Sequence, residues 1–308
     1  MTATRPDPVD QPYWLAADEP GDGPVGATPS DARARDLPLD AHLHTDQSPD
    51  SSVPIDAYAA EALARGIPEI AITDHVDFDH RDPAYRYASY ASRERTVRDA
   101  AARWGERGVA IRFGVELTYQ RWWEDDIRSH LARHRYDYVI GSVHDWPDSP
   151  YLRPRVAAWV AGRSVEEVVA PYVEQVVAAA RSGLFDTIGH LDVVKRYLAP
   201  YVKPADLAAR PQLYDEALRA IVESGAALEV NSSGLRHNVA EPYPRAETVA
   251  RFRELGGERV VAGSDAHRRE WFAFRLDEAY RLIEAAGFGA LTFRRGGSSL
   301  GVPLPTRS

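Results

Sequence analysis

The chain has 308 residues, of which 44% are hydrophobic and 27% charged, and its formal net charge at pH 7 is −9. This composition is typical of a globular protein with one large α/β barrel or two ordinary domains. The acidic excess argues against a nucleic-acid-binding surface. No apolar run could span a bilayer, the first residues lack the apolar core of a signal peptide, and no cysteine is present for a disulfide framework. We therefore expect a cytoplasmic protein.

The chain divides into a short extension and one long domain. Residues 1–36 are rich in Pro, Gly, Asp and Ala, and we expect them to be loosely ordered. From Leu37 to residue 308, apolar strand-like runs alternate with helical patterns, so we expect one domain there. The predicted strands are 37–41, 69–73, 109–117, 136–143, 185–190, 226–231 and 259–264. The predicted long helices are 55–66, 87–104, 165–183, 212–225, 245–257 and 270–287.

Seven strands that alternate with helices predict a single β/α barrel. Several of the helical runs end in glycine, as is usual where a left-handed residue closes a helix before the next strand. The final residues, LTFRRGGSSLGVPLPTRS, predict one short strand followed by a tail.

Potential metal ligands follow the predicted strands in seven short clusters. The nine residues are His42, His44, Asp50, His75, Glu116, His144, His190, Asp265 and His267. Because β/α barrels place their chemistry at the carboxyl ends of the strands, we expect these side chains to gather at one end of the barrel. Imidazoles mixed with carboxylates suit zinc, iron or manganese rather than calcium. Nine ligands exceed what one ion can use, so we expect two or three divalent ions.

Spacing supports this interpretation at particular positions. His42 and His44 are two residues apart after a strand, so both side chains point the same way and can chelate one ion. Asp265 and His267 repeat the same spacing after the last strand. Glu116 interrupts an otherwise apolar strand, where an unpaired carboxylate would cost several kcal/mol, so a metal partner is the natural explanation. Asp74 fits a turn or helix cap at least as well as a ligand.

Taken together, these motifs resemble the PHP (polymerase and histidinol phosphatase) family of metal-dependent phosphoesterases over about residues 37–295. The resemblance implies a distorted (β/α)7 TIM-like barrel with a trinuclear centre at the carboxyl ends of the strands. It assigns His42, His44, Glu116 and Asp265 to the first ion, Glu116, His144 and His190 to the second, and Asp50, His75 and His267 to the third. Asp50 stands where many relatives carry histidine. Glu116 would bridge two ions.

Two further segments resemble the histidinol-phosphatase branch of that family. They are LEVNSSGLRHNVAEPYP (228–244) and GHLDVVKRY (189–197). The resemblance implies hydrolysis of L-histidinol phosphate, a step of histidine biosynthesis, by a hydroxide that bridges two metal ions. The expected catalytic residues are Glu116, Asp265, Asp192 and Arg236, and the expected substrate-binding residues are Arg236, Lys195 and Asn231.

Each of these roles has its own rationale. Arg236 would clamp the phosphate with its planar, permanently charged guanidinium, and its alternative is a solvated surface arginine. Lys195 and Arg196 are weaker phosphate candidates. Asp192 is a candidate general acid, or else a partner that orients a ligand histidine. Asp77 and Asp79 could receive the ammonium or imidazole of the substrate.

Several other residues are interpreted as structural. His130 and His134 lie one helical turn apart without a third ligand, which favours a solvated helix face. Trp122 and Trp123 either line the mouth of the pocket or cap the barrel. His80 and His237 lie in loops beside motif residues, where either could touch a substrate, but we expect surface roles for both.

Two other functions remain compatible with the sequence. One is a phosphoesterase that acts on another small phosphomonoester, a nucleotide or a nucleic-acid 3′ end, which the acidic net charge disfavours. The other is a non-catalytic, metal-bound interaction module, which the loss of a ligand would favour. We expect a small phosphorylated substrate as the partner, and no nucleic acid or membrane. We expect the protein to be a monomer or a small homo-oligomer.

Overall fold

Parallel strands form the wall of a barrel. The computed structural model describes residues 37–304 except 147 and 296–297, so the predicted extension, 1–36, lies outside the described residues. Within the described part, seven strands are hydrogen-bonded in chain order: β1 (Asp40–Leu43), β2 (Glu69–Ile72), β4 (Ala110–Thr118), β5 (Tyr138–Ser142), β6 (Thr187–Ile188), β7 (Ala227–Asn231) and β8 (Val260–Gly263). The two-residue strand β3 (His75–Val76) follows β2 closely along the chain and pairs with β4 as well.

The first and last strands of the wall meet and close it. Leu43 forms an isolated parallel bridge with Ala266. The backbone N–H of His44 donates to the carbonyl of Ala266 at 3.0 Å, and the N–H of Asp265 donates to the carbonyl of His42 at 2.9 Å. The predicted seven-stranded TIM-like barrel is therefore confirmed.

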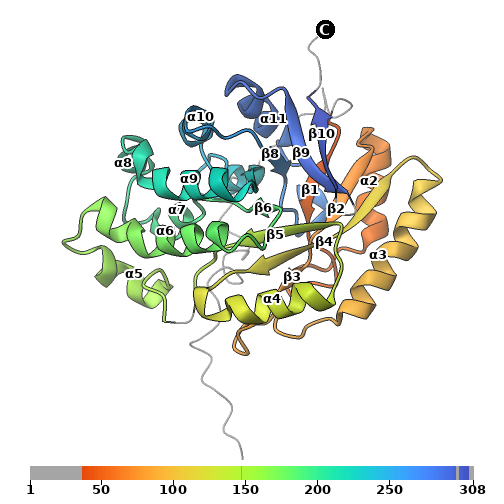
Figure 1. Ribbon diagram of the computed structural model, residues 1–308, viewed down its shortest axis with the longest axis horizontal. Helices are drawn as coiled ribbons and strands as arrows, with labels where there is room; N and C mark the ends of the chain where they lie inside the picture. Colours follow the sequence, from red (N-terminus) through yellow and green to blue (C-terminus); the bar gives the residue numbers. More distant parts are fainter. Residues whose placement is uncertain (1–36, 147, 296–297, 305–308) are drawn as a thin grey trace, which may run out of the picture.

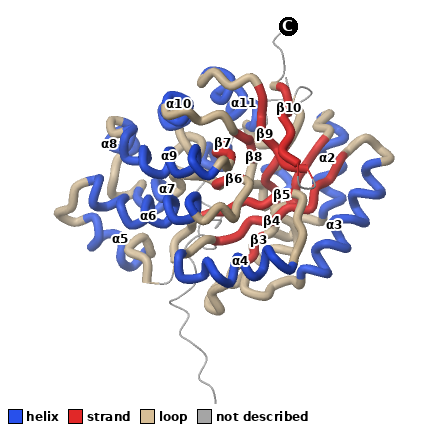
Figure 2. The backbone as a smooth tube through the Cα atoms, viewed as in Figure 1, coloured by secondary structure: helices blue, strands red, loops and turns tan. Residues whose placement is uncertain are grey.

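Helices surround this wall, and Figure 2 shows the strands gathered in the middle. The α-helices are α2 (Ile55–Arg65), α3 (Tyr90–Gly105), α4 (Glu124–Arg133), α5 (Arg153–Val160), α6 (Val165–Arg181), α7 (Val194–Leu198), α8 (Pro204–Ala208), α9 (Asp215–Ser224), α10 (Ala246–Glu254) and α11 (Leu276–Ala285). Short 3-10 helices cover Arg121–Trp123, Pro211–Tyr214, Ser232–Arg236 and Arg269–Trp271. Helices α6 and α9 lie side by side (Figure 1). Across the described residues, no helix is both long enough and apolar enough to cross a bilayer.

Local signals set several helix ends. Helix α6 begins with a capping box, in which the Ser164 hydroxyl accepts from the Glu167 N–H and the Glu167 carboxylate accepts from the Ser164 N–H. Helix α2 is capped at its carboxyl end by Gly66, whose φ of 71° is left-handed. The helix predicted from residue 270 begins only at Leu276, because Arg275 before it has a φ of 48°.

The prediction for the last residues was wrong in part. A second strand, β10 (Ser298–Pro303), pairs antiparallel with β9 (Ala290–Arg295), so the expected tail folds back. Phe293 packs against Tyr138 with the ring centroids 4.7 Å apart, and Tyr138 is the first residue of β5. The hairpin therefore contacts the amino-terminal side of the wall. The second strand was not predicted because Gly, Ser and Pro in this segment give no apolar alternation.

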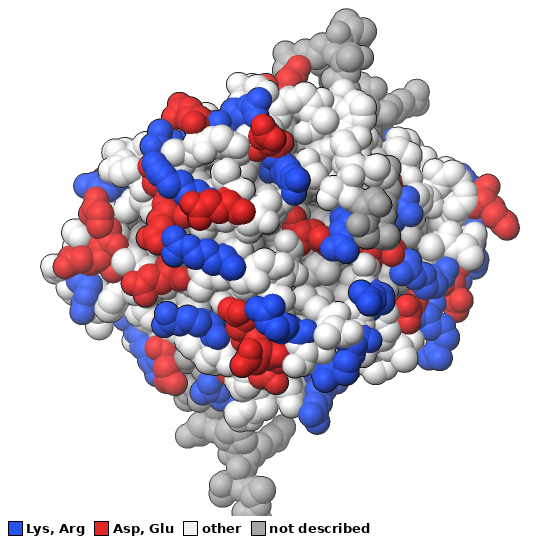
Figure 3. All heavy atoms as spheres, in the orientation of Figure 1, with Lys and Arg blue, Asp and Glu red and all other residues white. Residues whose placement is uncertain are grey.

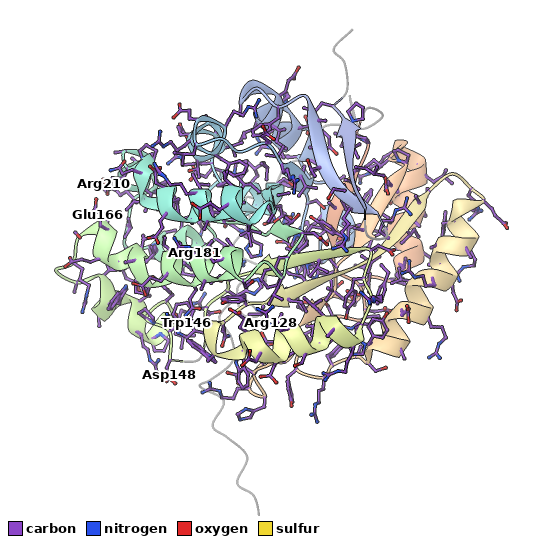
Figure 4. All side chains as sticks on the ribbon, in the orientation of Figure 1. Arg128, Trp146, Asp148, Glu166, Arg181 and Arg210 are labelled. Carbon is purple, nitrogen blue, oxygen red and sulfur yellow. The ribbon has the colours of Figure 1, made fainter. Side chains whose placement is uncertain are left out.

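Surface charges pair across neighbouring elements. Arg210 donates to Glu166 at 2.9 Å and joins the loop after α8 to the start of α6, at the edge of the molecule in Figure 4. Exposed pairs of this kind contribute little to stability.

The apolar core is one continuous cluster of buried side chains from the strands and the inner helix faces.

A substitution at Gly141 tests how tightly the wall of the barrel is packed. A Cβ at this position in β5 would lie 2.3 Å from the Phe185 ring, close to its root, so the whole ring would have to move. We expect Gly141→Ala to lower the free energy of unfolding by about 1–3 kcal/mol. Gly105→Ala is the control, since nothing lies within 4 Å of its Cβ position. Equal midpoints of urea unfolding for the two variants would contradict this packing.

Candidate metal centre

The nine predicted ligands meet at the carboxyl ends of the strands. Their donor atoms form groups in which all members lie within 4.8 Å of one another. Six of the nine residues are buried, and Asp50, Asp265 and His267 are half-buried. The groups are His42, His44 and Asp265; Glu116, His144 and His190; and His44, Asp50, His75 and His267. These residues could each offer a ligand atom to a divalent ion.

The first group has the dimensions of a tetrahedral site. His42 Nε2 and His44 Nε2 are 3.0 Å apart, and Asp265 Oδ1 lies 3.6 and 3.3 Å from them. Glu116 Oε2 lies 3.3 and 3.4 Å from the same two nitrogens. Four ligands placed about 2.1 Å from one ion would be separated by about 3.4 Å. The first ligand set implied by the family resemblance therefore fits the geometry.

Glu116 lies between the groups and is fully buried in β4. Its Oε1 faces His190 Nε2 at 2.9 Å and His144 Nε2 at 3.6 Å. Its Oε2 faces His42, His44 and also His75 Nδ1, the last at 2.9 Å. Oε1 thus faces the second group and Oε2 faces the first and third, which is the arrangement that a bridging carboxylate needs.

The third group is built around Asp50. Its Oδ2 lies 3.2 Å from His75 Nε2 and 3.0 Å from His267 Nε2. The ring of His44 stacks on both of these histidines, with centroids 4.2 and 4.1 Å apart. A donor atom of His44 also lies within 4.8 Å of the donors of this group, and the expected ligand set did not include it.

Burial and opposite charges compete in this centre. Burial alone would raise the pKa values of Glu116, Asp265 and Asp50, but the surrounding histidines hold them well below the usual range. Burial lowers the pKa of His144 to about 3, against the attraction of Glu116. The carboxylates therefore stay ionised in a buried site, which favours cations.

Outer partners fix the histidine rings. His144 Nδ1 lies 3.3 Å from Thr118 Oγ1, and His267 Nδ1 lies 3.0 Å from the carbonyl of Asp265. Hydrogen bonds of this kind select the ring tautomer and orient the other nitrogen. Asp74 accepts from the backbone and hydroxyl of Thr45 instead of joining a ligand group, as expected for a turn residue.

The interpretation of the sequence missed Glu229. This carboxylate is fully buried in β7, and its Oε1 lies 2.7 Å from His42 Nδ1. The signal that singled out Glu116, a carboxylate inside an apolar strand, is equally present in AALEVN.

A cleft opens beside the candidate ligands. Besides metal-ligand candidates it is lined by Val193, Arg196, Tyr197, Ser233, Arg236, His237 and Trp271.

Arg236 is anchored at this cleft. Its Nη1 and Nη2 donate to the carbonyls of Ser264 and Asp265, both at 2.9 Å, and its guanidinium lies over the Trp271 ring. Arg236 is thus buried beside the ligands and is not a solvated surface arginine.

Other expected substrate contacts lie elsewhere. Lys195 Nζ is 3.1 Å from both Asp192 and Glu241 and is absent from the cleft lining, whereas Arg196 belongs to it. The structure thus favours Arg196 over Lys195 as a phosphate contact. Asp192 is buried against Lys195 and does not line the cleft, so its position disfavours a role as general acid.

Asn231 also acts inside the wall. Its Nδ2 donates to Glu229 at 3.2 Å and lies 3.4 Å from Asp265 Oδ2, so it orients carboxylates and does not line the cleft. Asp77 and Asp79 are likewise absent from the lining, and Asp79 pairs with Arg81 at 2.8 Å. The expected substrate contacts at these positions are not supported.

The remaining histidines and tryptophans differ in how far they are exposed and in whether they line the cleft. His237 was expected at the surface but lines the cleft, with Nδ1 3.0 Å from the Tyr243 hydroxyl. His130 is half-buried against Tyr136 and is not on a solvated face. His80 is exposed, as expected. Trp122 is half exposed and, like Trp123, lies outside the cleft lining.

Comparison with known proteins identifies the family. Residues 40–233 match the model of the PHP domain. The chain belongs to the PHP domain family. A protein of Deinococcus radiodurans named "Probable histidinol-phosphatase" is 32% identical over 261 residues, which cover 83% of this chain and 96% of that protein. The histidinol-phosphatase of Lactococcus lactis is 27% identical, over 82% of this chain and 93% of its own length.

The fold also matches that of solved structures. A histidinol phosphate phosphatase from Lactococcus lactis, complexed with zinc, L-histidinol and phosphate, superimposes with a TM-score of 0.71 at 25% identity and covers 85% of this chain and 98% of that one. A putative histidinol phosphatase from Listeria monocytogenes has a TM-score of 0.58 at 16% identity, which supports the fold alone.

Divalent-metal binding follows from the family and the donor groups, and it should release protons near pH 7. Burial lowers the pKa values of His42 and His75, but neighbouring carboxylates outweigh it and raise both well above the usual range. Both rings are then protonated at pH 7 without metal, and metal affinity should rise with pH. Calorimetric titration with Zn²⁺ in two buffers of different ionisation enthalpy measures the release. A buffer-independent binding enthalpy would contradict it.

Proposed function

We propose that this protein is a metal-dependent phosphatase that hydrolyses L-histidinol phosphate to L-histidinol and inorganic phosphate. One observation carries the proposal: an anchored arginine, Arg236, lines the same cleft as the buried histidine and carboxylate groups. The Lactococcus protein, of similar fold, was solved with zinc, L-histidinol and phosphate. We further propose that the enzyme acts in the cytoplasm, as expected for a biosynthetic phosphatase.

We propose that two or three divalent ions occupy the centre, held by the nine ligands. The set of imidazoles and carboxylates, without thiolates, fits zinc, manganese or iron. When bound, such ions supply a water of lowered pKa and neutralise charge on phosphoryl oxygens. Elemental analysis after expression with each metal tests the number, and a fully active chain with at most one ion would overturn it.

The residues of the chain supply the rest of the chemistry. Ionised Glu116 and Asp265 hold the centre together and accept no proton at neutral pH, because the pKa of each is held well below its usual range. Arg236 and Arg196 present planar cations suited to two phosphoryl oxygens at once. In the transition state these oxygens carry most of the charge, so contacts there lower the barrier.

Other functions are less well supported. Lys, Arg, Asp and Glu are mixed across the face drawn in Figure 3, without a continuous basic stripe for a nucleic acid. Another small phosphomonoester remains the alternative substrate. A non-catalytic module is disfavoured because each of the nine expected ligands lies in one of the groups.

A phosphate-release assay tests the substrate. We expect the metal-loaded protein to hydrolyse L-histidinol phosphate with higher kcat/KM than other phosphomonoesters, including nucleotides and sugar phosphates. Treatment with a chelator should abolish the activity, and adding back metal should restore it. Faster hydrolysis of a nucleotide would reject the proposed substrate but keep the phosphatase.

Arg236 variants test the phosphate clamp. Loss of one charge-assisted contact costs about 1.5–3 kcal/mol, so Arg236→Ala should lower kcat/KM about tenfold to a few hundredfold. Arg236→Lys should recover only part, because an ammonium lacks the bidentate fork. Metal content must be measured as well, since Arg236 also binds the carbonyl of Asp265. Arg210→Ala, at an exposed ion pair, is the control. A metal-loaded Arg236→Ala variant with unchanged kinetics would contradict the role.

A further inference from the structure

Glu229 is a buried carboxylate with three donors around it. Its Oε1 lies 2.7 Å from His42 Nδ1. Its Oε2 accepts from the backbone N–H of His190 at 2.8 Å and from Asn231 Nδ2 at 3.2 Å. One side chain thus links a histidine of the first group to the backbone of a histidine of the second.

The partners of Oε2 cannot change their roles. The His190 N–H is a backbone donor, and Asn231 must present its amide nitrogen because its Oδ1 accepts from the Ser233 N–H at 2.9 Å. Oε2 therefore has to be an acceptor. Oε1 is then left for His42, and the 2.7 Å contact is a hydrogen bond when the ring carries its proton on Nδ1.

The opposite nitrogen of His42 faces the ligand group. Nε2 lies near Glu116 Oε2 and Asp265 Oδ1, at 3.3 and 3.6 Å. A neutral imidazole that is protonated on Nδ1 has its lone pair on Nε2, where it can bind an ion.

The backbone is shaped around this contact. A Cβ on Gly263 would lie 2.4 Å from His42 Cβ and 2.7 Å from Glu229 Oε1. Any side chain there would push the ring and the carboxylate apart. Glycine in β8 therefore allows Glu229 to reach His42 across the barrel.

We propose that Glu229 is a positioning residue that holds His42 in the one neutral tautomer able to bind metal. The inference rests on the proposed metal-dependent function. Partners of this kind typically change metal affinity 10- to 100-fold.

Glu229→Gln is a sharp test because its shape is nearly unchanged. In the variant, the amide nitrogen of the new glutamine replaces one of the two carboxylate oxygens. It has to face either the His190 N–H and Asn231 Nδ2, which can only donate, or His42. Only His42 can adapt, by moving its proton to Nε2, so the amide should turn toward it. His42 would then carry a hydrogen where the ion must bind.

Zinc binding by competition with a chromophoric chelator measures the effect. We expect Glu229→Gln to hold one zinc ion 10- to 100-fold more weakly than the wild type. Glu69→Gln is the matched control, since Glu69 is a buried carboxylate in β2 that pairs with Arg112 outside the centre. Wild-type zinc affinity in Glu229→Gln, or equal weakening in both variants, would overturn the inference.

Nitrogen-15 NMR of the histidine rings provides a second, independent readout. In the zinc-loaded wild type, His42 should carry its proton on Nδ1, and in Glu229→Gln on Nε2. If the variant does not fold, the wild-type spectrum still decides, because a His42 without an Nδ1 proton would reject the inference. Neither measurement involves substrate. A wild type that binds zinc but does not hydrolyse histidinol phosphate would therefore reject the proposed function and leave the role of Glu229 intact.

Discussion

The structure depends on the burial of ionised carboxylates among imidazoles inside the barrel. Glu116 is fully buried in β4, with both oxygens directed at histidines and, among the described residues, none at an arginine or lysine. Such a group would be very unfavourable in an apolar core, and the surrounding rings offset this only while they carry protons. Divalent ions are the stronger counter-charge. The buried negative charge of this site therefore favours the binding of divalent metal ions.

One residue, Asp265, couples the candidate metal ligands to the proposed phosphate clamp. Asp265 has a φ of 53°, a left-handed conformation that is uncommon outside glycine. Its carboxylate faces His42 and His44, while its carbonyl accepts from Arg236 and lies 3.0 Å from His267 Nδ1. In this backbone conformation Asp265 makes all four contacts at once. Substrate affinity and metal affinity should be hard to alter separately at this position.

The amino-terminal and carboxyl-terminal ends of the barrel have different tasks. Near the beginnings of β5 and β6, Tyr138 packs on Phe293 and Asp186 pairs with Arg294, so the β9–β10 hairpin covers that side. At the other end the wall residues are polar, and glycines such as Gly263 let side chains approach closely. Stability and chemistry are thus separated along the strands, as in other β/α barrels.

The sequence by itself determined the barrel and the candidate ligands, because apolar runs that alternate with helical patterns and end in His, Asp or Glu are local features. Only the tertiary structure decided which neighbouring residues face the cleft. Lys195 and Arg196 are adjacent in the chain, yet one is held by Asp192 and Glu241 and the other lines the cleft. Glu229 owes its importance to a ring 187 positions away in the chain. Side-chain direction and long-range partners depend on how strands pack together, and no local pattern encodes that.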